Sequence, residues 1–162
     1  MSFVLSLSVI SASATNTDGQ DDFVSFIMEY DDNYEIYELG DGSTVIFGVI
    51  PAISLYEGYD IESATARPTA SHTYTCLAAY GNHCRGAIEN IDEENDMTAT
   101  MSYAASSAPE DNASSTRTLS PGQRLVMVAS SISGNGLTGT MTATITAKQA
   151  SSVTYSYTVD QY

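Results

Sequence analysis

The feature that most constrains this chain is a strict alternation of residue types between residues 137 and 147. Every even position in this stretch is threonine, and the odd positions are apolar or small. A period of two places the two sets on opposite faces of a β-strand, whereas a helix would scatter the threonines and crowd their branched Cβ atoms. We therefore predict an inner strand of a β-sandwich, with one face on the core and one hydroxylated face.

Similar patterns occur elsewhere in the chain. Residues 97–103 alternate in the same way, with methionine, alanine and tyrosine on one side and hydroxyls on the other. Residues 34–39 and 43–50 flank a Gly-Asp-Gly sequence and predict a hairpin, because glycine supplies the positive φ angles of a tight turn. Residues 45–50 are almost continuously apolar, which predicts a strand covered on both faces.

Two stretches are harder to interpret. Residues 23–30 have apolar residues at helical spacing, but their aromatic and branched side chains favour a strand, and we predict a strand. Residues 104–115 are rich in serine and predict a loop. With about ten strands at intervals of roughly 8 to 15 residues, the fold class we expect is all-β. Residues 1–162 should form a single-domain antiparallel β-sandwich of jelly-roll or immunoglobulin-like type.

The beginning of the chain predicts a terminal strand within residues 1–14. Phe3, Leu5, Leu7 and Val9 share one face, and the stretch lacks the positive start of a signal peptide. This assembly strand has two alternative placements: it pairs within its own domain, or it completes the sheet of a neighbouring subunit. A secretory leader is the remaining interpretation.

The charge excludes several classes of partner. The net charge is -15, from 20 acidic and 5 basic residues among 162. Such a chain repels phosphate groups, so we expect no nucleic-acid binding and no binding to anionic membranes. We also expect no membrane insertion, because no run of about 18 apolar residues is present. An acidic, lysine-poor surface suits a high-salt, halophilic host, and an ordinary acidic protein is the alternative.

All histidines and cysteines fall in one window, at His72, Cys76, His83 and Cys84. Zinc takes such ligands, but His72 and Cys76 are four residues apart on a strand, or about 13 Å, which is too far to share one ion. Cys76 and Cys84 can pair as a disulfide across the intervening turn. A pair of free thiols and a metal site with His83 are the two alternatives.

Acidic loops provide the candidate calcium ligands. Asp18, Asp21 and Asp22 form the best set, although neither they nor the runs at residues 31–32 and 93–96 match an EF-hand loop. Loop carboxylates usually face water. We expect no other cofactor.

The sequence offers little for catalysis. It has no Gly-x-Ser-x-Gly turn, and both histidines lie near cysteines. It also lacks tryptophan, a common platform for sugars. We therefore expect that the chain is not an enzyme. The threonine rows fit a sheet face that is solvated or packed against a partner. The alternative is a surface that orders water as ice-binding surfaces do, which needs several adjacent rows in register.

These observations are typical of a building block. The chain has 11 tyrosines, and tyrosine is frequent at interfaces. We expect a structural subunit of a symmetric, self-assembling homo-oligomer, with copies of itself and other structural proteins as partners. A virion is the expected location, in its capsid, decoration, turret or tail. One alternative is a secreted filament, pilus or adhesin subunit at the cell surface, joined by strand donation. The other is a calcium- or carbohydrate-binding module.

Overall fold

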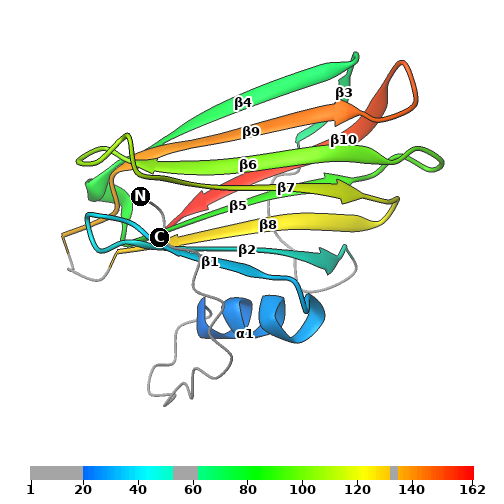
Figure 1. Ribbon diagram of the computed structural model, residues 1–162. Coiled ribbons are helices and arrows are strands. Elements are labelled where there is room, and N and C mark those ends of the chain that lie inside the picture. Colours follow the sequence, from blue (N-terminus) through cyan, green and yellow to red (C-terminus); the bar gives the residue numbers. More distant parts are fainter. Residues whose placement is uncertain (1–19, 53–61, 132–134) are drawn as a thin grey trace.

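A computed structural model describes residues 20–52, 62–131 and 135–162, which form ten strands in two antiparallel sheets (Figure 1). The larger sheet runs β1 (Glu35–Glu38), β2 (Thr44–Pro51), β8 (Gln123–Ser130), β5 (His83–Asn90), β10 (Val153–Gln161) and β3 (Glu62–Ala66). The smaller sheet runs β4 (Thr69–Cys76), β9 (Gly139–Ala147), β6 (Met97–Ala105) and β7 (Asn112–Leu119). Helix α1 (Gln20–Tyr30) and the 3-10 turn Ala78–Tyr80 complete the described elements. The expectation of an all-β, antiparallel β-sandwich with about ten strands is confirmed.

The alternation of apolar and hydroxyl residues at 97–103 and 137–147 is confirmed in β6 and β9, which pair at the centre of the smaller sheet. Their inward side chains face the larger sheet and are buried, and burying a side chain the size of methionine contributes about 1.5–3 kcal/mol. Their outward positions carry threonine, serine or a single alanine. The buried inward residues are Met97, Ala99, Met101, Tyr103 and Ala105 in β6, and Met141, Ala143, Ile145 and Ala147 in β9.

The predicted hairpin is also confirmed, because β1 and β2 pair antiparallel around a turn in which Gly42 has a φ of 85°. Strand β2 is covered on both faces, as its apolar run predicts. Val45 and Phe47 belong to the core between the sheets. Ile50 belongs instead to a second apolar cluster on the outer face of the larger sheet.

The predicted strand at residues 23–30 is wrong, because this segment belongs to helix α1. The helix lies against β2 (Figure 1), where Ile27 is fully buried beside Ile50 and Val126. A Cβ atom at Gly48 would collide with Cγ2 of Ile27, so this glycine lets the helix approach the sheet closely. The helical spacing prevailed because β2 needs an apolar cover on its outer face, and one stripe of a helix supplies it.

The predicted loop at residues 104–115 is wrong at both ends. Strand β6 continues to Ala105, and β7 begins at Asn112. Within β7, Ala113 and Ser115 are buried and Ser114 is exposed. The two-residue period of burial is therefore present, but small residues occupy these inward positions. Small side chains fit there because Tyr103 in β6, paired directly with Ala113, is itself fully buried.

Replacing Ile27 with alanine tests the packing of α1 on the sheet. The change Ile27→Ala removes a fully buried side chain and should lower the free energy of unfolding by about 2–4 kcal/mol. Ser25→Ala, at an exposed position of the same helix, is the matched control and should stay within about 0.5 kcal/mol of wild type. Urea denaturation measures both. Equal stability of the two variants would contradict the placement of α1.

Candidate functional site

The outer face of the smaller sheet carries an array of hydroxyl groups, which we call the hydroxyl face. Its strands pair so that outward residues line up in four rows across β4, β9, β6 and β7. Ala104 and Asn112 are the two positions without a hydroxyl. The rows are Thr69-Thr146-Thr98-Thr118, Ser71-Thr144-Thr100-Thr116, Thr73-Thr142-Ser102-Ser114 and Thr75-Thr140-Ala104-Asn112.

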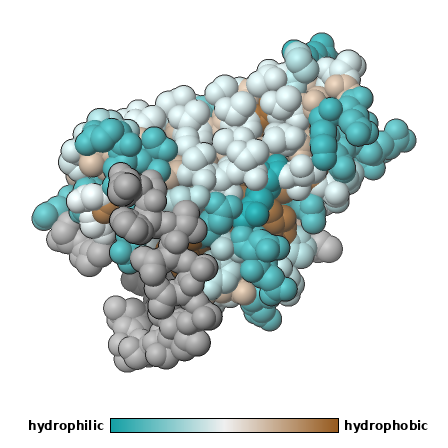
Figure 2. Space-filling model, viewed as in Figure 1, coloured by the Kyte–Doolittle hydropathy of each residue, from teal (hydrophilic) through white to brown (hydrophobic). Residues whose placement is uncertain are grey.

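The hydroxyl face is neutral and mostly free of internal hydrogen bonds. No position in its four rows carries a charged side chain. Thr100 and Thr116 bond to each other at 2.9 Å, and Thr69 and Thr146 lie 3.4 Å apart. In Figure 2 the area over β4, β9 and β6 is pale, with the most hydrophilic residues gathered at its two ends. At the rim, Lys148 Nζ lies 3.5 Å from the hydroxyl of Thr118.

Strand β4 forms one edge of the smaller sheet. It pairs with β9 on one side, and no described strand pairs with its other side. Its sequence, Thr-Ala-Ser-His-Thr-Tyr-Thr-Cys, contains no acidic residue, lysine or arginine. Natural edge strands are usually protected by charge, proline or a bulge. Strand β4 carries none of these charges, and no described strand covers its outer edge.

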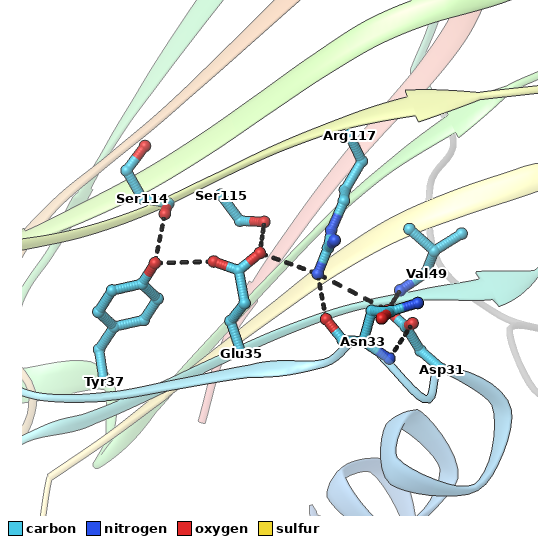
Figure 3. A network of polar contacts seen from close by, with 8 residues as sticks. All are labelled: Asp31, Asn33, Glu35, Tyr37, Val49, Ser114, Ser115 and Arg117. Carbon is cyan, nitrogen blue, oxygen red and sulfur yellow. Dashed lines mark hydrogen bonds and ion pairs between the residues drawn. The ribbon is translucent and has the colours of Figure 1, made fainter. Parts of the chain in front are cut away.

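The opposite side of the sandwich is closed by a polar network between β1 and β7 (Figure 3). Arg117 of β7 forms an ion pair with Glu35 of β1 at 2.8 Å and lies 4.0 Å from Asp31, just after α1. Its guanidinium also donates to the backbone oxygen of Asn33. Asp31 accepts a hydrogen bond from the backbone N–H of Val49 at 2.8 Å. The network therefore ties α1, both sheets and the β1 edge together.

Tyr37 extends this network along the same edge (Figure 3). Its hydroxyl lies 2.7 Å from the Glu35 carboxylate and 2.9 Å from the backbone oxygen of Ser114. Burial, together with the nearby Glu35 carboxylate, raises the pKa of Tyr37 to about 12. The phenol therefore stays protonated at neutral pH and acts as a hydrogen-bond donor, which is a structural role.

Sequence reasoning missed this network because its members are far apart along the chain. Ser115 Oγ, for example, donates to Glu35 at 2.9 Å across 80 positions. One signal was available: Arg117 occupies an inward position of the alternating strand β7, where a charged side chain needs a partner. The sequence does not identify that partner.

Cys76 and Cys84 are buried free thiols that face each other from β4 and β5, in opposite sheets. The hydrogen bond that the Cys84 thiol donates to the Cys76 sulfur, together with burial, raises the pKa of Cys84. His72 does not join them, because its ring stacks on Tyr157 with centroids 4.6 Å apart and its Nε2 lies 2.7 Å from the Tyr155 hydroxyl. Among the described residues, no group of three histidine, cysteine or acidic side chains is arranged to hold a metal.

The disulfide between Cys76 and Cys84 remains a prediction, and oxidation tests it. Diamide, a thiol oxidant, should remove two electrons and two protons from the pair and join the sheets. The crosslink should stabilise the fold by about 2.5 kcal/mol through loop closure, which raises the melting temperature. Thiol titration of the denatured protein and thermal melting measure both effects, with Cys84→Ala as the unresponsive control. Two reactive thiols and an unchanged melting temperature after oxidation would contradict it.

The predicted calcium and assembly residues are only partly covered. Asp18 and the assembly strand with Phe3, Leu5, Leu7 and Val9 lie outside the described residues. Asp21 and Asp22 belong to the first turn of α1, and their side chains are also outside the described part. The calcium site and the assembly strand therefore stay predictions.

Asp92, which directly precedes the acidic run at residues 93–96, has a structural role. Asp92 accepts hydrogen bonds from the backbone N–H groups of Thr154 at 3.0 Å and Glu94 at 3.1 Å. Those bonds, the Thr154 bond first, lower the pKa of Asp92 to about 2. Asp92 thus fastens the β5–β6 loop to β10.

The described helices include none that is both long and apolar enough to cross a membrane.

Comparison with known proteins gives distant structural matches only. No family model and no curated protein matches the chain. Among solved structures, a dTDP-4-dehydrorhamnose 3,5-epimerase from Sulfolobus tokodaii aligns at 11% identity and a TM-score of 0.44, over 79% of this chain and 75% of that one. PirA aligns at 14% identity and a TM-score of 0.28, over 59% of this chain and 99% of PirA.

The epimerase match corrects one expectation. We expected that the chain is not an enzyme, and the finding that overturns this is a similar solved structure that is an enzyme. We therefore withdraw the expectation. The likeness is too low to assign the epimerase reaction to this chain.

Proposed function

We propose that this chain is a structural subunit of a larger symmetric assembly, and that a virus particle is that assembly. The observation that carries the proposal is the uncharged edge strand β4, which has a sheet partner on one side only in the described part of the chain. An open edge offers N–H and C=O groups at regular spacing, and pairing with another chain satisfies them.

Electrostatics supports the same edge as the meeting point. A chain with a net charge of -15 repels its own copies, so contacts form best where charge is absent. Strand β4 provides such an area, because none of its side chains is acidic or is a lysine or arginine. The closed β1–β7 edge is less suitable, because Arg117, Glu35 and Tyr37 already use its polar groups internally.

The second candidate is a secreted filament, pilus or adhesin subunit at the cell surface. The same β4 edge favours it, because the predicted assembly strand of one copy matches an eight-residue edge strand of the next. The two candidates differ in the product: a virion subunit builds closed shells or tails, and a donated strand builds open fibres.

The assembly proposal is tested on the purified full chain by mass photometry and electron microscopy. Wild type should form particles far above its 17.2 kDa mass. The double variant Ser71→Lys and Thr73→Lys places charge on the edge strand and should yield folded monomers. Thr142→Lys and Thr144→Lys is the matched control, with the same charge change on the same face but one strand inward, and should still assemble.

Two results would count against this proposal. A wild type that stays monomeric at every concentration removes the assembly function. Assembly that persists in the edge variant but is lost in the inner-strand control removes β4 as the contact and assigns the contact to the sheet face.

A further inference from the structure

We propose that the hydroxyl face binds an ordered, ice-like lattice of water. The inference goes beyond the assembly function and does not depend on it, because pairing through the β4 edge leaves the outer face of the sheet open. It rests on the register, hydrogen bonding, charge and rigidity of the four rows.

The hydroxyl face is periodic in two directions. Adjacent strands lie about 4.8 Å apart, and alternate residues along a strand are about 6.7 Å apart. Because the four strands pair without a slip, every outward side chain occupies a point of this grid. A two-dimensional grid of one chemical group favours a partner with its own regular repeat.

Most hydroxyls of the face have no hydrogen-bond partner among the described residues. Within the described rows, direct hydroxyl–hydroxyl contacts join Thr100 to Thr116 and Thr69 to Thr146, and Lys148 contacts Thr118. The central residues Thr142 and Thr144 have no described protein partner for their hydroxyls. Water must complete these hydrogen bonds, and the grid sets where that water lies.

The absence of charge on the hydroxyl face also favours ice as its ligand. Ice is a neutral lattice of donors and acceptors, and a charged side chain would hold a hydration shell that disrupts its regular order. The hydroxyl face carries no charged side chain on a protein whose net charge is -15, so it matches a neutral lattice. Each threonine adds a methyl group that rests against water without competing for hydrogen bonds.

The hydroxyl face is also rigid. The inward side chains of β6 and β9 are buried, which fixes the two central strands beneath the face. Threonine has few χ1 rotamers because its Cβ is branched, so its hydroxyls lose little freedom when they bind. A sugar ligand fits less well, because the rows contain no aromatic side chain on which a ring stacks.

The test measures ice growth in solutions of the purified full chain. Wild type should slow recrystallisation in a frozen sucrose film and shape single ice crystals. The double variant Thr142→Lys and Thr144→Lys should lose both effects, because it places two charges in the middle of the grid. Thr65→Lys and Thr154→Lys, on the outer face of the other sheet, is the matched control and should keep both. Melting curves and far-ultraviolet circular dichroism establish that all variants are folded.

If the double variant does not fold, Thr100→Lys repeats the test from the neighbouring inner strand and should also abolish the effect. Wild-type ice growth identical to that in buffer would overturn the proposal. Equal loss in the face variant and the control would also overturn it, because the effect would then not belong to the hydroxyl face. Dimers that the face variant abolishes, without any ice activity, would assign the face to a second copy instead. The two outcomes that concern ice alone leave the assembly proposal to its own test, whereas the dimer outcome would also move the assembly contact from the β4 edge to the sheet face.

Discussion

The burial of every second residue of β6 and β9 against the larger sheet is the interaction on which the rest of this structure depends. It places methionine, tyrosine and isoleucine in one core and leaves threonine and serine outside. The register that buries the inward side chains also aligns the outward threonines and serines, because both belong to the same paired strands. The hydroxyl face is therefore a consequence of core packing, and its regularity is inherited from the strand pairing.

The remaining surfaces of the sandwich are completed by different means. Helix α1 covers the outer apolar face of β2 through Ile27, and the close approach at Gly48 makes this contact tight. The β1–β7 side is closed by the ion pair of Arg117 and Glu35. The outer edge of β4 has neither kind of cover among the described residues. Assembly through this edge would complete the sandwich in the same way as the helix and the network complete the other sides.

The sandwich could be predicted from the sequence because apolar and hydroxyl residues alternate strictly in its core strands. The prediction was wrong at residues 23–30, where the apolar residues fit both a helix and a strand. Only the need to cover the outer face of β2 decides between them. The prediction was also wrong at Asn112–Leu119, where alanine and serine at inward positions conceal the period. The site was predicted in outline only. The threonine rows are visible in sequence, but their alignment depends on non-local pairing, as do the partners of Arg117 and the meeting of Cys76 with Cys84.

The central claim is that alternation in β9 separates a face packed in the core from a face that tolerates substitution. The most direct measurement is the free energy of unfolding of single lysine variants at successive positions from 140 to 146. Lysine at the buried positions Met141, Ala143 and Ile145 should destabilise the fold by more than about 3 kcal/mol, because an unpaired charge enters the core. Lysine at the intervening threonines should cost less than about 1 kcal/mol. Losses without this two-residue period, or with a helical one, would contradict the account.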